Sequence, residues 1–308
     1  MKDSGESPLF PFKLNRKIVL GFSQVGSESD WRKANTKSVQ DAAKEADIEL
    51  KFSNAEQKQE NQIKAIRSFI VDQVDVIAFS PVVQSGWEPI LKEAKLAGIP
   101  VIIIDRTVDV TDTSLYNTFM GSDFYEEGRK AGKYLLDKMK DVSGAIHIAE
   151  LQGTVGSAPS IDRKKGFADT IKANPNMIII QSEPADFTVD KGKLVMESFL
   201  QTEGKKIQVL FAHNDDMALG AIDAIEKYGL LPGEDIIILS VDGTRRAIEM
   251  LAAGKLNFVV ECNPLLGPQL MQAVKELMAG RILPKRIVTK DNVFTQEMAE
   301  REIKNRKY

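Results

Sequence analysis

The chain has 308 residues, a formal net charge of -3, 43% hydrophobic residues and 28% charged residues. This balance suits one large globular domain or two of about 150 residues, and it argues against nucleic-acid or bulk membrane binding. The single cysteine, Cys262, excludes an internal disulfide, and no apolar run reaches the roughly 18 residues that a membrane-spanning helix needs.

Residues 1–16 form a polar leader or linker that contains Pro8 and Pro11 and lacks the basic and then apolar pattern of a signal peptide. Two interpretations of this start remain open. Either the protein is cytosolic, or it is exported and the signal peptide has been removed, with Met1 added.

Short apolar runs that predict β-strands recur along the rest of the chain in two series. The runs are continuous rather than alternating, which is typical of strands buried on both faces of a parallel sheet. The first series comprises residues 17–22, 48–52, 74–80, 100–104 and 116–120, and the second comprises residues 145–151, 177–181, 207–212, 236–241 and 257–261.

Helical patterns lie between these strands, with apolar residues spaced by three and four positions. They cover residues 31–46, 57–71, 86–97, 123–140, 160–173, 189–201, 215–228 and 265–279. Such alternation gives doubly wound parallel sheets, and two series of about five strands predict two similar α/β lobes. Ligands bind such sheets at the carboxyl ends of the strands, so two facing lobes predict a cleft between them.

Polar and aromatic side chains gather where the predicted strands end and helices begin. Planar groups that each hold two hydroxyls, together with aromatic faces for the C–H side of a ring, are what sugar recognition requires. The candidate sugar-binding residues are Trp31, Arg32, Ser80, Asp105, Arg106, Arg163, Phe187, Asn214, Asp242 and Glu261.

Each candidate also has a simpler interpretation when it is taken alone. The residues around Asn214 can serve as a helix cap, Asp242 begins a common turn dipeptide, and Trp31 can be a core residue. The Asp105–Arg106 pair can lie on a surface loop. Their joint position at strand ends is what favours a binding site.

Several longer strings resemble the ribose-type cluster of periplasmic sugar-binding proteins. These strings are Asp105–Arg106, residues 162–167, 186–188, 213–217 and 241–243. Residues 21–29, 31–32, 57–62, 86–89 and 150–154 are closer still to the galactofuranose-binding proteins of bacterial sugar ABC transporters. The resemblance covers about residues 17 to 295.

The resemblance implies roles for the matching positions. Asp105, Arg106, Arg163, Asn214 and Asp242 would bind ring hydroxyls, with Arg32, Ser80 and Glu261 as additions and with Trp31 and Phe187 as stacking faces. Two departures argue against ribose as the ligand. Asp30 stands where the ribose-type pattern has an aromatic residue, and Cys262 stands where those proteins often carry Gln.

The family also implies a type I periplasmic fold and a mechanism of hinged closure. We expect an N-terminal lobe of residues 17–118 plus 263–289 and a C-terminal lobe of residues 119–262 plus 290–308, with crossings near Thr118, Asn263 and Lys290. Closure around a monosaccharide would create the form that an ABC permease recognises. We expect a monomer in the periplasm or cell envelope, without cofactor, metal or nucleic-acid partner.

Two other functions are compatible with this architecture. The sensing core of a transcription regulator has the same architecture, but residues 1–16 are too short for its DNA-binding helices. A sugar-modifying enzyme would need an acid/base pair, for which Asp105 with Asp242 is the one loose candidate. Because Arg106 neighbours Asp105, an ionised, hydrogen-bonding role suits that carboxylate better. We therefore expect a binding protein and not an enzyme.

Overall fold

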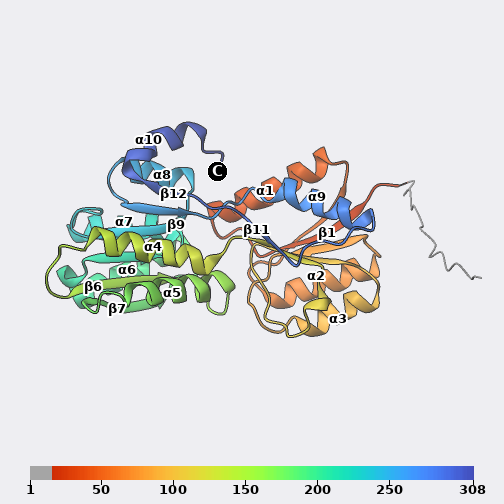
Figure 1. The fold of residues 1–308 in the computed structure, drawn as a ribbon, viewed down its shortest axis with the longest axis horizontal. Helices are drawn as coiled ribbons and strands as arrows, with labels where there is room; N and C mark the ends of the chain where they lie inside the picture. Colours follow the sequence, from red (N-terminus) through yellow and green to blue (C-terminus); the bar gives the residue numbers. More distant parts are fainter. Residues whose placement is uncertain (1–15) are drawn as a thin grey trace, which may run out of the picture.

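The computed structural model describes residues 16–308, and these fold into two α/β lobes, each built on a six-stranded sheet (Figure 1). The predicted leader, residues 1–16, lies outside the described residues except for Arg16. None of the helices in residues 16–308 combines the length and the apolarity needed to cross a bilayer.

The first sheet has the strand order β11-β5-β4-β3-β1-β2, and all its pairs are parallel. Its strands are β1 (Val19–Gln24), β2 (Glu49–Asn54), β3 (Val76–Phe79), β4 (Val101–Ile104), β5 (Thr118–Gly121) and β11 (Arg286–Val288). Strands β3 and β4 are buried along their whole length, as their unbroken apolar sequences predict.

The second sheet has the order β12-β10-β9-β8-β6-β7. Its strands are β6 (Ile146–Gln152), β7 (Met177–Pro184), β8 (Val209–Ala212), β9 (Ile237–Asp242), β10 (Phe258–Glu261) and β12 (Val293–Thr295). The predicted lobes with parallel sheets are confirmed, and β12 alone among these strands runs antiparallel to its neighbour, β10.

Helices cover both faces of each sheet. In the first lobe, α1 (Asp30–Glu45) and α9 (Gly267–Met278) pack on one face, and α2 (Gln59–Val71) and α3 (Glu88–Leu96) pack on the other. In the second lobe, α4 (Phe124–Lys138) and α5 (Ala158–Ile171) cover one face, opposite α6 (Val189–Glu203), α7 (Asp215–Tyr228), α8 (Arg245–Ala252) and α10 (Gln296–Asn305). Helices α8 and α10, like β11 and β12, were not predicted.

The chain crosses between the lobes three times, after β5, between β10 and α9, and between β11 and β12. The sequence predicts the first crossing near Thr118, whereas residues 118–121 form β5 inside the first sheet, so the first lobe extends to Gly121. The predicted crossings near Asn263 and Lys290 fall inside the other two segments. Because the strands of both sheets end toward this junction, their carboxyl ends face each other.

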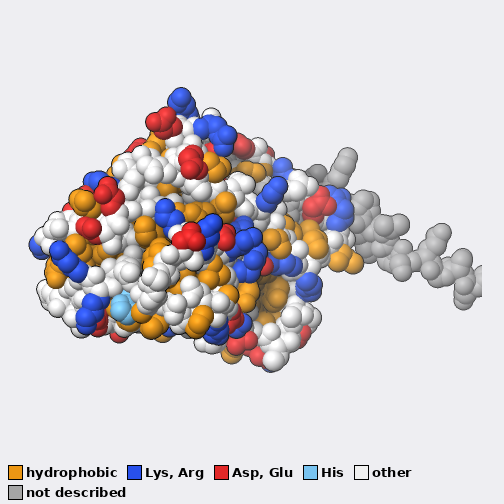
Figure 2. All heavy atoms as spheres, turned by 60° about the vertical axis from the view of Figure 1, so that its left-hand side comes forward, with side chains coloured by type: hydrophobic (Ala, Val, Ile, Leu, Met, Phe, Trp, Pro, Cys, Tyr) orange, Lys and Arg blue, Asp and Glu red, His pale blue; other side chains and the backbone are white. Residues whose placement is uncertain are grey.

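The two lobes also touch directly away from the crossings. The backbone N–H of Gln84, after β3, donates to the carbonyl of Gly156, after β6, at 2.9 Å. This contact closes the junction on one side. The view of Figure 2 shows Lys, Arg, Asp and Glu side chains interspersed over the surface, as expected for solvated faces.

Candidate functional site

A polar pocket lies between the lobes, at the carboxyl ends of both sets of strands. It contains about 300 Å³ of space free of protein atoms, including the part open to solvent. Its lining residues come from both lobes and are Glu28, Ser29, Trp31, Arg32, Asp105, Arg106, Phe124, Pro159, Arg163, Phe187, Asn214, Asp242 and Cys262.

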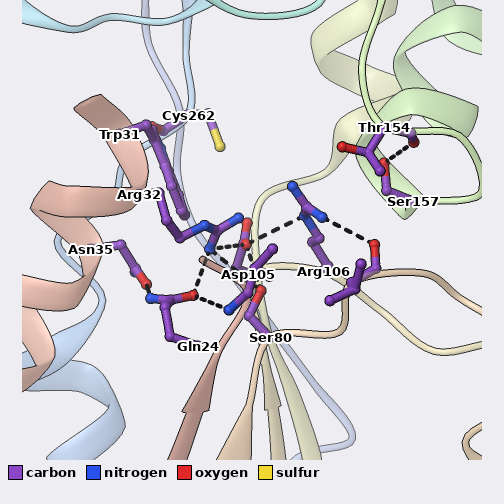
Figure 3. A network of polar contacts seen from close by, with 12 residues as sticks. Gln24, Trp31, Arg32, Asn35, Ser80, Asp105, Arg106, Thr154, Ser157 and Cys262 are labelled. Carbon is purple, nitrogen blue, oxygen red and sulfur yellow. Dashed lines mark hydrogen bonds and ion pairs between the residues drawn. The ribbon is translucent and has the colours of Figure 1, made fainter. Parts of the chain in front are cut away.

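Arg32 organises the half of the pocket that belongs to the first lobe (Figure 3). It lies in the first turn of α1, and the side chain of Ser29, which caps this helix, accepts from the Arg32 N–H. The buried guanidinium donates from Nη1 to Asp105 Oδ2 at 2.8 Å and from Nε to Glu28 Oε1 at 3.0 Å. Burial lowers the pKa of Arg32, but Asp105 and Glu28 raise it more, so it stays above its ordinary value.

Asp105 is held in place from several sides. It follows β4 with a positive φ of 60°, which is uncommon for a residue with a side chain. Its N–H donates to the Met120 carbonyl at 2.7 Å, and the Ser80 hydroxyl donates to its Oδ2 at 2.8 Å. These bonds stabilise the unusual backbone and fix the carboxylate at the pocket.

Arg106 reaches from the first lobe to the second. Its guanidinium lies 5.3 Å from the ring centre of Phe187 and donates from Nη1 to the Val82 carbonyl at 3.1 Å. Its Nε is buried and has no hydrogen-bond partner among the described residues. Burial and then the charge of Arg32 lower the pKa of Arg106 to about 10, so it remains protonated at neutral pH.

Arg163, in α5, organises the half that belongs to the second lobe. It donates from Nε to Glu127 Oε2 at 2.7 Å and from Nη1 to the His213 carbonyl at 2.5 Å, and its Nη2 lies 3.7 Å from Asp242 Oδ1. Burial raises the pKa of Glu127 to about 7, against the opposing effect of Arg163. The two lobes thus present similar pairs of arginine and carboxylate.

Asp242 ends β9 with a positive φ of 126°. The turn that follows is tied down by the buried Asp215, which accepts from the N–H groups of Gly243 at 2.8 Å and Thr244 at 2.7 Å. Burial raises the pKa of Asp242 well above its usual range, and Arg163 opposes this rise. The Asp242 side chain lines the pocket beside Arg163.

Aromatic side chains form the walls of the pocket. Trp31 is anchored by its Nε1, which donates to the Cys262 carbonyl at 2.6 Å, so it bridges α1 and the second crossing. Phe187 lies over Gly153, where a Cβ would come within 1.8 Å of the ring. The absence of a side chain at Gly153 therefore allows the Phe187 ring to pack at this position.

The structure brings eight of the ten predicted residues together around this pocket, and Ser80 and Glu261 are the two exceptions. Ser80 lies behind the lining, where it supports Asp105. Glu261 was predicted to bind sugar, but its carboxylate accepts from Arg306 Nη1 at 2.7 Å and from the Tyr308 hydroxyl at 3.0 Å. Glu261 lies outside the pocket lining because the tail after α10 folds back over the end of β10.

Sequence reasoning missed five lining residues, which are Glu28, Ser29, Phe124, Pro159 and Cys262. Glu28 stands four residues before Arg32, a spacing that favours an ion pair and could have signalled its role. The buried thiol of Cys262 lies 3.5 Å from Ser122 Oγ at the first crossing. Asn214 caps α7 and also lines the pocket.

The chemistry of the pocket is that of balanced hydrogen bonding. Three arginines and three acidic residues line it, so it offers both donors and acceptors. The Cys262 thiol has a pKa raised well above its ordinary value by burial, so it is not a thiolate at neutral pH. His213 is buried and bound to Glu150 at 3.1 Å, and burial lowers its pKa.

Comparisons with known proteins agree with this geometry. A family model described as a periplasmic binding protein domain matches residues 20–282. The galactofuranose-binding protein YtfQ of Escherichia coli is 46% identical over 94% of this chain and 92% of its own length.

Two solved structures are similar over nearly the whole chain. A Mycobacterium smegmatis protein in complex with β-D-fucofuranose is 53% identical, covers 94% of each chain and superposes with a TM-score of 0.92. The periplasmic binding protein component of the arabinose ABC transporter from Shewanella sp. ANA-3, bound to α- and β-L-arabinofuranose, is 49% identical over 94% of this chain and 95% of its own, with a TM-score of 0.90.

Proposed function

The chain belongs to the periplasmic binding protein family, and from this membership we propose that its pocket takes one sugar ring in the five-membered furanose form. It is a sugar-binding component of an ABC transporter, like the Shewanella relative, and the other two relatives are described with furanose sugars. The observation that carries the ligand proposal is the pairing of Arg32 with Asp105 and of Arg163 with Glu127 and Asp242 around one pocket between the lobes.

Each lobe would hold part of the sugar. Arginine donates to the hydroxyl and ring oxygens, and Asp105 and Asp242 accept from hydroxyl hydrogens. The buried Nε of Arg106, which has no protein acceptor among the described residues, would donate to a sugar oxygen. Trp31 and Phe187 would pack on the C–H faces of the ring.

The furanose form is favoured by the relatives rather than by the lining alone. Galactofuranose, β-D-fucofuranose and L-arabinofuranose in their names and titles share a five-membered ring, while their exocyclic groups differ. A pocket that recognises the ring and its hydroxyls from two sides would tolerate that variation. We propose the same tolerance here.

We further propose that the protein acts outside the cytoplasm and delivers its sugar unchanged. Sugar contacts on both lobes favour the closed arrangement, and a permease would recognise that arrangement. A binding protein of this kind does not need to activate a hydroxyl. The arginines and carboxylates of the pocket are paired with each other, which suits hydrogen bonding to the sugar rather than proton transfer.

Titration calorimetry with ring-locked sugars tests the proposal. 5-Deoxy-L-arabinose can close only as a furanose, whereas 4-deoxy-L-arabinose can close only as a pyranose, and each lacks one hydroxyl. We expect the furanose-only sugar to bind more tightly than L-arabinose. Only a small fraction of L-arabinose is in the furanose form in water, and this lowers its apparent affinity. The pyranose-only sugar should give no binding.

Two outcomes would contradict the proposal in different ways. Binding of the pyranose-only sugar alone would overturn the ring form and leave a sugar-binding protein. Absence of any binding to these sugars, to D-galactose and to D-fucose would overturn the function itself.

A further inference from the structure

Beside the pocket, the first turns of two helices from opposite lobes meet. Helix α1 of the first lobe begins at Asp30, and helix α7 of the second lobe carries Asp216 in its first turn. Neither residue lines the pocket, although Asp30 adjoins Trp31 and Asp216 follows closely on Asn214. This contact can therefore stabilise the closed arrangement of the lobes without contacting the sugar.

The contact completes the hydrogen bonding of a helix end. The first N–H groups of any α-helix lack acceptors within the helix. In α1 the Ser29 hydroxyl accepts from the N–H of Arg32, and the Asp216 carboxylate accepts from the N–H of Asp30 at 3.0 Å. One N-terminal donor of α1 is thus satisfied by the other lobe.

A second, weaker contact lies beside it. Arg246, at the start of α8, approaches Asp30 Oδ2 with its Nη1 at 3.3 Å, so it also joins the lobes. Arg246 and Asp30 are partly exposed, with 54% and 33% of their side chains accessible, and ion pairs of this kind contribute little. Asp216 is 4% exposed, so its hydrogen bond is the stronger candidate.

We propose that Asp216 is a positioning residue for closure, which caps α1 across the lobe boundary and lengthens the time that a bound sugar is retained. The inference rests on the proposed function, because retention is defined only for a protein that binds sugar. The bond exists only while the lobes are together. Its loss should therefore raise the dissociation rate and leave the association rate nearly unchanged.

The charge of Asp216 is not what the contact needs. Burial, and next the Asp30 carboxylate, raise the pKa of Asp216 to about 7, which shows that an ionised group is costly there. A neutral amide oxygen accepts the same N–H without that cost. Asp216→Asn should consequently retain sugar at least as long as the parent protein, whereas Asp216→Ala should not.

The donor can be removed independently of Asp216. Asp30 is the first residue of α1, where proline is well tolerated, and Ser29 before it has an extended backbone with φ -137° and ψ 162°, which suits a residue before proline. Asp30→Pro therefore deletes the N–H and the side chain, while Asp30→Ala deletes the side chain alone. The difference between these two variants isolates the hydrogen bond.

Stopped-flow tryptophan fluorescence with D-galactose measures both rates, because Trp31 lines the pocket. Asp216→Ala and Asp30→Pro should each raise the dissociation rate about tenfold, the effect of losing one hydrogen bond to a buried group. Asp30→Ala should raise it far less. Adding Asp216→Ala to Asp30→Pro should have little further effect, because the bond is already gone.

The control is Asp223→Ala, which removes an exposed carboxylate from the same helix α7. It should leave both rates within about twofold of the parent. Equal dissociation rates for Asp30→Pro and Asp30→Ala, or an effect of Asp216→Ala confined to association, would overturn the inference. If Asp216→Ala fails to fold, the comparison of Asp30→Pro with Asp30→Ala still tests the inference. Failure of the parent protein to bind any furanose-forming sugar would count against the proposed function instead.

Discussion

At the scale of single residues, the pocket depends on arginines whose geometry is fixed by buried partners. Arg163 bonds Glu127 and the His213 carbonyl and still faces Asp242. A lysine carries the same charge but lacks the planar fork that reaches three partners. Charge alone is therefore insufficient at this position.

We expect Arg163→Lys to weaken sugar binding about 10- to 100-fold, the range for losing charge-assisted hydrogen bonds of about 1.5–3 kcal/mol. Titration calorimetry with D-galactose measures the change. Lys165→Ala, which removes an exposed lysine of the same helix, is the control and should bind like the parent. An unchanged affinity for Arg163→Lys would mean that this side chain serves the fold alone.

The reassignment of Glu261 gives a second test at this scale. Because Glu261 pairs with Arg306 and Tyr308 rather than facing the pocket, Glu261→Gln should leave the sugar affinity within about twofold. It should lower the melting temperature, since removing one partner of a buried ion pair leaves the other unpaired. A large loss of affinity with unchanged stability would restore the original sugar-binding prediction.

At the scale of elements, the two helices that carry Arg163 and Glu127 pack unusually closely. Gly128 of α4 lies against α5, and a Cβ at this position would come within 2.1 Å of the Arg163 carbonyl oxygen. The obstacle is backbone, which cannot move without shifting the helix. Glycine at 128 therefore sets the distance between α4 and α5.

Gly128→Ala should consequently lower stability by about 1–3 kcal/mol, the usual cost of overpacking, and should also weaken sugar binding because Arg163 moves with α5. Calorimetric melting and sugar titration check the two effects. Lys133→Ala, on the exposed face of α4, should alter neither. If Gly128→Ala melts and binds like the parent, the two helices tolerate separation, and Gly128 does not set the distance between them.

Much of the fold could be predicted at this scale, because continuous apolar runs identify strands buried on both faces. All ten predicted strands are present, with ends displaced by a few residues. Strands β11 and β12 were missed because they have three residues each and only one of these six residues is buried. Their place in the sheets depends on strands that are far away in the sequence, and a local sequence pattern does not show such pairing.

The site was predicted less completely than the fold, for a related reason. Asp105, Arg106, Asn214 and Asp242 follow strands, so the rule that ligands meet strand ends selects them. Glu127 supports Arg163 from a neighbouring helix, which only the three-dimensional arrangement shows, whereas the spacing of Glu28 and Arg32 could have indicated their ion pair. Glu261 follows the same strand-end rule but lies outside the pocket lining, because its carboxylate pairs with a tail that comes much later in the chain.

At the scale of the whole molecule, several buried carboxyl groups have raised pKa values. Burial is the first cause in each case, and it raises the pKa of Glu127 and Asp216 to about 7 and that of Asp215 and Asp291 to about 6. The folded state therefore binds more protons than the unfolded state between about pH 4 and pH 7. Stability falls as the pH rises through that window and levels off above it.

We expect the ligand-free protein to melt at a higher temperature at pH 5.5 than at pH 8, and calorimetry across this range measures it. Glu127→Gln removes one of the titrating groups and should reduce the difference. Below about pH 4.5 the sign reverses, because hydrogen bonds from His213 and Ser182 outweigh burial and lower the pKa of Glu150, and that stabilisation is lost on acidification. A melting temperature that rises steadily toward pH 8 would refute this assignment.

The three crossings have a consequence for how the chain grows and folds. In the first sheet Arg286 of β11 pairs beside Phe119 of β5, and in the second sheet β12 pairs with β10, so both sheets receive an edge strand from the last part of the chain. A nascent chain that stops before residue 286 leaves β5 and β10 as unpaired edges, which invite association with other chains. Non-local pairing of this kind also slows folding. The two lobes must therefore be completed almost together, and neither can be finished while synthesis of the C-terminal segment is pending.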